Sequence, residues 1–303
     1  MPNVTLREIN NAVLTDAEGY IEKCESRYRQ VIASISNDVC RQQGRMIVML
    51  AGPSSSGKTT TAKLLKENII KNGRHASVVS LDDFYLDQEV SYTFEDGTVD
   101  YETIKALDTD LIISCLIELV ERGESNIPRF SFHSKKRESF EKMSVANDEI
   151  IIVEGLHALN PIITEPLEKE NMLKLYVSVS SRIFDGDKIL LSKRDIRFIR
   201  RLIRDYHFRN SSAEYTFYLW NGVRMGEDRY LFPFSGNADV KIDSIHPYEI
   251  CLFKNIATQL LDHIDSNSVY YASAKRLKDK LSMFVSLNKT VTDEKSLLKE
   301  FIG

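Results

Sequence analysis

Residues 46–60 read MIVMLAGPSSSGKTT, and this stretch decides the fold. An apolar run of six residues leads into a loop, Gly52 to Thr59, that matches the pattern GxxxxGK[ST], and the helical run TTAKLLKENIIKNG follows. The pattern needs a strand before it and a helix after it, because loop amides and the helix N-terminus together cradle phosphate groups. The stretch therefore predicts a phosphate-binding loop (P-loop); an ordinary turn rich in Gly and Ser is the alternative.

The loop residues suggest how a nucleotide would be held. Lys58 is placed to reach the β- and γ-phosphates, and the Thr59 hydroxyl is placed to ligate Mg²⁺. The sequence has no NKxD-type guanine-reading segment, which favours ATP over GTP. The residues expected to bind ATP are Gly52, Ser54, Ser55, Ser56, Gly57, Lys58, Thr59 and Thr60.

Short apolar runs alternate with helical stretches along the rest of the chain. They span residues 77–81, 149–155, 173–179 and 238–244. Apolar strands separated by helices predict an α/β fold with a parallel sheet covered by helices on both faces. We expect a P-loop domain over 45–265, a helical N-terminal arm over 1–44 (helical from about Asp16 to Gln43) and a C-terminal helical extension over 266–303; residues 247–264 and 272–284 are read as closing helices.

Composition limits the class of protein. The 303 residues are 43% hydrophobic and 28% charged with a net charge of -4, so no global positive field favours nucleic acid or an anionic membrane. The four cysteines are far apart and form no CxxC pair, as suits a reducing compartment. The N-terminus lacks a signal-peptide pattern, and no apolar stretch is long enough to span a membrane. We expect a cytoplasmic protein without membrane or nucleic-acid partners.

Two carboxylates follow predicted strands at the edge where open α/β sheets bind ligands. Asp82, after residues 77–81, is the expected catalytic residue, because a carboxylate there can accept the proton of an attacking hydroxyl and help to hold Mg²⁺. A capping role in the next turn is the alternative. Glu154, after residues 150–153, is the expected Mg²⁺ ligand, directly or through water; a solvated loop glutamate is the alternative.

A strongly basic segment at about residues 185–211 predicts a helical lid. Four arginines fall within roughly an 80° arc of one helix, and apolar residues occupy the opposite side. Such a helix would close over polyphosphate and exclude water. A solvent-facing helix paired with Asp195 and Asp205, or an RNA-binding patch, is the alternative. The arginines are Arg194, Arg197, Arg201 and Arg204, and the apolar residues are Ile196, Ile199, Leu202 and Ile203.

Five segments together resemble the uridine kinase and phosphoribulokinase family of P-loop kinases: AGPSSSGKTT, SLDDFY, IPRFSF, IIVEGLHALNP and RRLIRDYHFR. The likeness extends from about Arg45 to Ala257 and is greatest to bacterial uridine-kinase-like proteins that often carry a TGS module, which we expect to be absent here. The resemblance implies that Asp82 is the base that activates a ribose 5′-hydroxyl. It further implies lid roles for Arg201, Arg204 and Arg209 and metal roles for Thr59 and Glu154. The residues expected to bind the acceptor are Tyr85, Asp100, Phe130 and Arg209.

The expected function is ATP-dependent phosphorylation of a small-molecule hydroxyl, foremost the 5′-hydroxyl of uridine or cytidine. Phe130 stands where these kinases have a base-reading Tyr, His133 is offset from a family His, and Ser211 replaces a lid Arg. A sugar, sugar phosphate, pantothenate or polyol therefore stays open as the acceptor, as does a nucleotide-binding regulatory or RNA-associated protein. The resemblance also implies a homo-oligomer.

Overall fold

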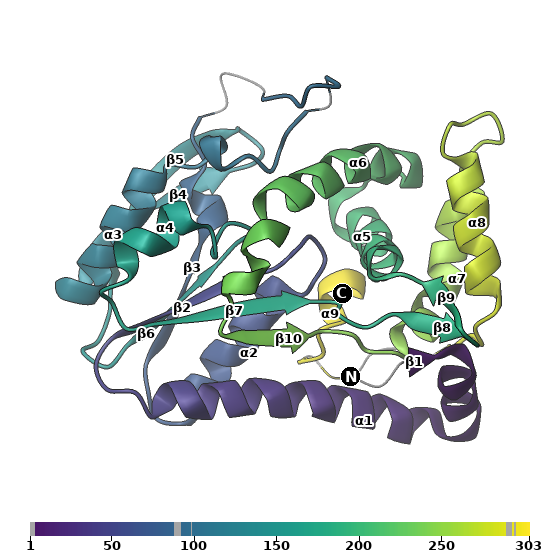
Figure 1. Ribbon diagram of the computed structural model, residues 1–303, viewed down its shortest axis with the longest axis horizontal. Helices are drawn as coiled ribbons and strands as arrows, with labels where there is room; N and C mark the ends of the chain where they lie inside the picture. Colours follow the sequence, from purple (N-terminus) through teal and green to yellow (C-terminus); the bar gives the residue numbers. More distant parts are fainter. Residues whose placement is uncertain (1–3, 88–91, 98, 289–292, 294) are drawn as a thin grey trace.

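A five-stranded parallel sheet forms the centre of the protein. The computed structural model describes residues 4–87, 92–97, 99–288, 293 and 295–303 (Figure 1). All neighbouring strand pairs in this sheet are parallel, which confirms the predicted architecture. Their order across the sheet is β10 (Val240–Asp243), β7 (Met172–Ser178), β2 (Met46–Ala51), β6 (Ile150–Glu154) and β3 (Ala76–Ser80).

Helices cover both faces of the sheet because its central strands are apolar on both sides. All six residues of β2 are buried, and alternate ones join different core clusters. Every second residue from Met46 packs with α1 (Leu6–Cys40) and α2 (Lys58–Lys71). Every second residue from Ile47 packs with α3 (Thr109–Glu121) and α4 (Pro161–Thr164) on the other face. The strand that leads into the P-loop is thus fixed between two cores.

The remaining elements include two small sheets that the sequence pattern does not reveal. An antiparallel hairpin, β4 (Glu124–Ser131) and β5 (Lys136–Ser144), carries the IPRFSF segment. The other sheet joins β1 (Val4–Thr5), β8 (Ile183–Asp185) and β9 (Lys188–Leu191), so the expected lid region begins as a hairpin. The other helices are α5 (Lys193–Arg209), α6 (Ala213–Tyr230), α7 (Glu249–Asp262), α8 (Tyr271–Ser282) and α9 (Lys299–Ile302), with 3₁₀ turns η1 (Leu81–Phe84), η2 (Ile104–Ala106), η3 (Glu165–Leu167) and η4 (Phe232–Asn237).

Helix α1 runs along one whole side of the molecule (Figure 1). The helix expected from about Asp16 to Gln43 is present after a kink at Asp16, and a helical segment that was not expected precedes it, beginning at Leu6 after a capping box formed by Thr5 and Glu8. Asp16 departs from helical geometry, with φ -153° and ψ 82°, and its carboxylate accepts the Gly19 amide at 2.9 Å. The helical pattern is therefore interrupted at the residue where the prediction placed its start.

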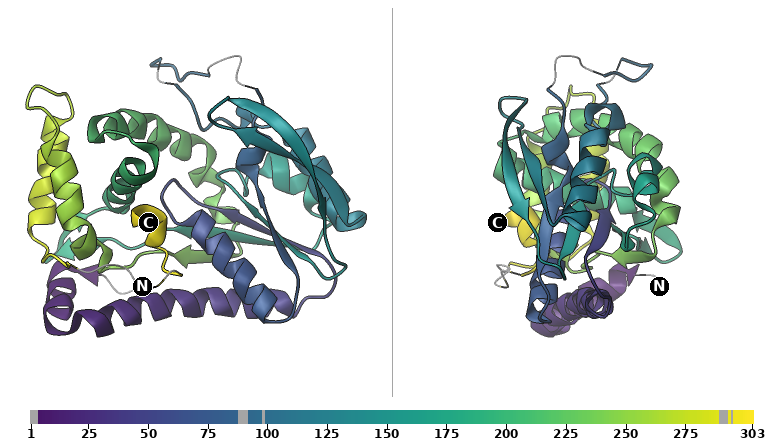
Figure 2. Two further views of the ribbon diagram at one scale, coloured as in Figure 1. Left: turned by 180° about the vertical axis from the view of Figure 1, so that it is seen from behind. Right: turned by 90° about the vertical axis from the view of Figure 1, so that its left-hand side faces the viewer.

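The end of the described chain returns to the core. The predicted closing helices are present as α7 and α8, and beyond them Leu297, Leu298 and Phe301 are fully buried in the same cluster as α1 and α2. Figure 2 (left) shows α9, in yellow, beside the loop that leads into α2. No helix in the described part of the chain has both the length and the apolar character needed to cross a membrane.

Candidate active site

A pocket of about 690 Å³ opens at the carboxyl ends of β2, β3 and β6, and the P-loop forms its floor. Ser54 to Thr59 line it, whereas Gly52 and Thr60 lie just outside its lining. Gly57 adopts φ +91°, in the left-handed region that favours glycine. A Cβ at Gly52 would collide with the backbone oxygen of Val177, so the first loop glycine is needed for close packing on β7.

The hydroxyls of the P-loop serines point to a ligand that accepts hydrogen bonds. The Oγ atoms of Ser55 and Ser56 are buried and have no hydrogen-bond partner in the described part of the chain. Among the described residues, the Lys58 ammonium donates only to the Pro53 carbonyl, at 3.3 Å, within the loop itself. Unpaired buried donors cost free energy, and phosphate oxygens bound in the loop would satisfy them.

The two predicted carboxylates meet above the loop. Parallel pairing of β3 with β6 places Ser80 opposite Glu154, and the Ser80 hydroxyl donates to Glu154 at 3.0 Å. Asp82 follows in η1 and opens to the pocket. Partial desolvation raises the pKa of both carboxyls, and their mutual repulsion adds to the rise for Glu154, while Lys58 opposes it in both cases. Asp82, Glu154 and Lys58 therefore act as one electrostatic group.

Helix α5 supplies arginines to the pocket, but not all those expected. Arg201, Arg204 and Arg209 line it and share the buried carboxylate of Asp205, at 3.0, 3.2 and 3.4 Å. The expected pairing with Asp205 therefore exists alongside a pocket role. The apolar side of the helix, Ile196, Ile199, Leu202 and Ile203, is buried as expected.

The other two predicted arginines lie elsewhere. Arg194 extends to Asp228 on α6 at the surface, and Arg197 is buried against Glu227, at 2.7 Å, and the Ser54 carbonyl, at 3.0 Å. Glu227 in turn accepts the Ser54 amide at 2.8 Å. Arg197 and Glu227 thus fix the shape of the P-loop rather than face bound phosphates, because the α5–α6 packing encloses them.

Three aromatic rings form part of the wall of the same pocket. Tyr85, Phe130 and Phe132 line the pocket with ring centroids 5.2–5.6 Å apart. Phe132 is the last residue of the IPRFSF segment, and the sequence pattern predicts no role for it. Phe130 and Phe132 are two residues apart, so extended chain places both on one face; the sequence pattern did not reveal the hairpin that presents this face to the pocket.

Glu102, rather than the predicted Asp100, lines the pocket. Asp100 is buried behind it, where its carboxylate accepts the Tyr230 hydroxyl at 2.6 Å and the Glu102 amide at 3.2 Å. Burial, with repulsion from Glu227, raises the pKa of Glu102 to about 7. Glu102 could have been predicted from its position two residues after Asp100, where it is a second acidic residue in the same segment.

Residues 47–250 match the phosphoribulokinase / uridine kinase family. The chain belongs to this family. A uridine kinase from Staphylococcus haemolyticus (strain JCSC1435) is 30% identical over 199 residues, which are 65% of this chain and 86% of that protein. A uridine kinase from Ureaplasma parvum serovar 3 is 24% identical over 198 residues, which are 65% of this chain and 87% of that protein.

Among solved structures, a candidate fructose transport system kinase from Silicibacter sp. TM1040 matches with a TM-score of 0.50 and 17% identity. The match covers 69% of this chain and 98% of that one, and it supports the fold alone. Membership of the phosphoribulokinase / uridine kinase family makes this protein a P-loop phosphotransferase that acts on a hydroxyl, with ATP as the donor that the family implies.

The oxygen donors of this kinase suit the Mg²⁺ that phosphoryl transfer usually needs. Thr59, Asp82 and Glu154 line one pocket. The negative charge of Asp82 makes ionisation of Glu154 less favourable and raises its pKa. The described residues contain no cluster of three or more His, Cys, Asp or Glu that would hold a metal alone. Mg²⁺ commonly binds through one or two carboxylates together with substrate phosphates and water, so this donor set fits it.

Replacing Glu102 is expected to change how the stability of the protein depends on pH. Between the usual glutamate pKa of 4.5 and the folded value of about 7, the folded state holds the extra proton. The free energy of unfolding should therefore decrease as pH rises from about 5 to 7 and level off above. Glu102→Gln should remove this change, on the order of 1 to 3 kcal/mol, in urea unfolding at pH 5 and 8.

Asp82 and Glu154 also have raised pKa values, but they titrate in both proteins and cancel in the comparison. Equal pH slopes for the wild type and Glu102→Gln would show that Glu102 is ionised in the fold and contradict this prediction.

Proposed function

We propose that this protein transfers the γ-phosphoryl group of Mg·ATP to the 5′-hydroxyl of a nucleoside, uridine or cytidine, to give the nucleoside monophosphate. One observation carries the proposal. A single pocket joins the phosphate loop, the Asp82 carboxylate and a wall of aromatic rings formed by Tyr85, Phe130 and Phe132. A planar base can stack on such a wall while its sugar extends toward Asp82.

The residues divide the work of transfer between them. Asp82 accepts the proton of the attacking hydroxyl while that oxygen bonds to the γ-phosphorus and the bond to the β-phosphate oxygen breaks. Lys58, Arg201 and Arg204 offset the negative charge of the transferring group. Mg²⁺, held by Thr59, Asp82 and Glu154, would supply further charge neutralisation when bound. Glu102 and Arg209 line the same pocket and are placed to contact acceptor hydroxyls.

A second acceptor class has its own support. Lys135 lines the pocket from the turn of the β4–β5 hairpin, where it adopts a left-handed φ of 56°. Phe130 lacks the hydroxyl with which a tyrosine would read a base. An acceptor that carries its own negative charge, such as a sugar phosphate, would use the Lys135 ammonium instead.

The test is ADP release from Mg·ATP across nucleosides, sugars, sugar phosphates, pantothenate and polyols. We expect uridine or cytidine to stimulate release at least tenfold over the acceptor-free rate, and Lys135→Ala to leave this stimulation within about threefold. Stimulation by an anionic acceptor that is lost in Lys135→Ala would replace the nucleoside with that acceptor. If none of the compounds stimulates release, the proposal of a small-molecule acceptor fails.

A further inference from the structure

Residues 295–303, here called the strap, lie directly on the P-loop. Leu297 packs against Gly57 so closely that any Cβ at that glycine would collide with it. Phe301 is fully buried, with the Arg200 guanidinium 5.1 Å from its ring centroid. Arg200 also donates to the Ser55 carbonyl at 3.3 Å, so the strap and the loop share one packed unit.

Glu300 of the strap occupies an anion position of the loop. Its carboxylate accepts the Thr60 amide at 3.3 Å and the Thr60 hydroxyl at 2.8 Å, and it lines the pocket. Thr60 lies in the first turn of α2, where backbone N–H groups have no partner within the helix. These are the groups with which a P-loop cradles nucleotide phosphates. A carboxylate and a phosphate are favoured there for the same reason.

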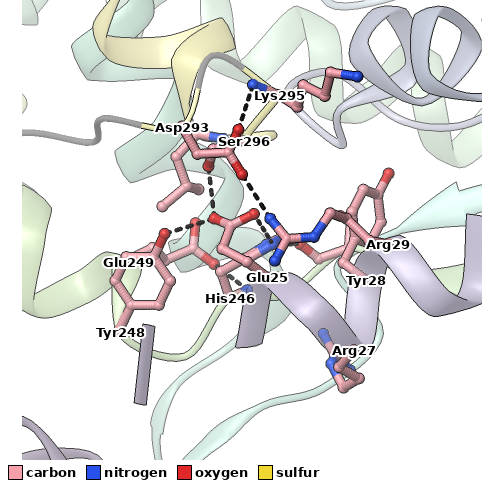
Figure 3. Close-up of polar contacts among 12 residues, drawn as sticks. Glu25, Arg27, Tyr28, Arg29, His246, Tyr248, Glu249, Asp293, Lys295 and Ser296 are labelled. Atoms are coloured by element: carbon pink, nitrogen blue, oxygen red, sulfur yellow. Dashed lines mark hydrogen bonds and ion pairs between the residues drawn. The ribbon is translucent and has the colours of Figure 1, made fainter. Parts of the chain in front are cut away.

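The position of Glu300 is built into the fold rather than left to a loose chain end. In Figure 3, Glu25 of α1 lies between Tyr248 and Ser296, whose hydroxyls both donate to it, at 2.7 and 2.6 Å. Just outside the strap, Asp293 is ion-paired with Arg29 of α1 at 2.5 Å (Figure 3). The arm and the strap thus hold one another, and together they place Glu300 on α2.

We infer that the Glu300 carboxylate holds a nucleotide-phosphate position, so that nucleotide binds only when Glu300 leaves Thr60. A carboxylate and a phosphate cannot share one amide, and their charges repel in a pocket that already contains Asp82 and Glu154. The observed affinity is then the intrinsic affinity reduced by the fraction of molecules in which the strap has moved. This inference rests on the proposed nucleotide-binding role of the P-loop.

The test compares the affinity for Mg·ADP of the wild type, Glu300→Gln and Glu165→Gln by titration calorimetry. Glu300→Gln keeps the shape of the side chain but replaces a charge-assisted acceptor with a weaker neutral one. We expect it to bind Mg·ADP about tenfold more tightly than the wild type. Glu165→Gln makes the same charge change at an exposed site in η3 and should stay within about twofold. Unchanged or weaker binding by Glu300→Gln would overturn the inference.

A second measurement decides the matter if Glu300→Gln does not fold. Hydrogen exchange of the wild type should become faster at the amides of Phe301, Ile302 and Gly303 when Mg·ADP is added, because their bonds to residues 298 and 299 depend on the seated strap. Equal or slower exchange would overturn the inference while leaving nucleotide binding established. Absence of Mg·ADP binding in the wild type and Glu300→Gln alike would instead remove the proposed function beneath it.

Discussion

Asp82→Asn is expected to lower the rate of phosphoryl transfer by about 10²- to 10⁴-fold. The change keeps the volume of the side chain but removes both the proton acceptor and one negative charge beside Lys58. The Asp82 side chain is exposed and opens to the pocket, so it contributes little to the packing of the core. The melting temperature should stay within a few degrees and the Mg·ATP affinity within a few-fold. The measurement is single-turnover product formation with the acceptor found by ADP release.

Asp83→Asn is the matched control, because it makes the same chemical change at the next residue. Asp83 pairs with Arg129 at 2.7 Å, away from the lining of the pocket. We expect a loss of less than about tenfold, as for a partly exposed ion pair. A turnover of Asp82→Asn near that of the wild type would contradict the role of Asp82 as base, and equal losses in the two variants would point to general electrostatics instead.

The sequence predicts the sheet and the P-loop because their signals are local. The apolar runs of β2 and β6 are buried on both faces, so their composition alone identifies them. The loop pattern also fixes the elements on either side of it, since β2 ends at Ala51 just before the loop and Gly57 caps the start of α2. Asp82 and Glu154 could be placed in one pocket for a related reason: both follow parallel strands, whose carboxyl ends meet at one edge.

Residues whose position depends on distant packing could not be found in this way. Glu300 meets Thr60 across 240 residues of chain, and Arg200 meets Glu249 only after α5 and α7 have packed. Helical periodicity placed Arg194 and Arg197 on the same face as Arg201, but it does not say which partner helix covers each turn of that face. Glu102 was missed because Asp100, two residues earlier, has the same charge and an equally plausible place in the pattern.

Arg200 is the strongest case of a residue that distant packing defines. It is fully buried, and its guanidinium makes a bidentate pair with Glu249, at 2.5 and 2.9 Å, which is fully buried too. It also donates to the Ser244 carbonyl at 2.8 Å and to the Ser55 carbonyl. One side chain thus joins α5, the P-loop, the end of β10 and the ring of Phe301 in the strap.

Arg200→Met should therefore destabilise the protein by about 3 to 5 kcal/mol in urea unfolding, because it leaves the Glu249 carboxylate buried without a partner. Arg194→Met, on the same helix, removes a partly exposed arginine paired with Asp228 and should cost at most about 1 kcal/mol. Adding Glu249→Leu to Arg200→Met should recover part of the loss, because no charge is then left unpaired. A double variant no more stable than Arg200→Met would show instead that the lost contacts of Arg200 with Ser244 and Ser55, rather than the buried charge on Glu249, account for the cost.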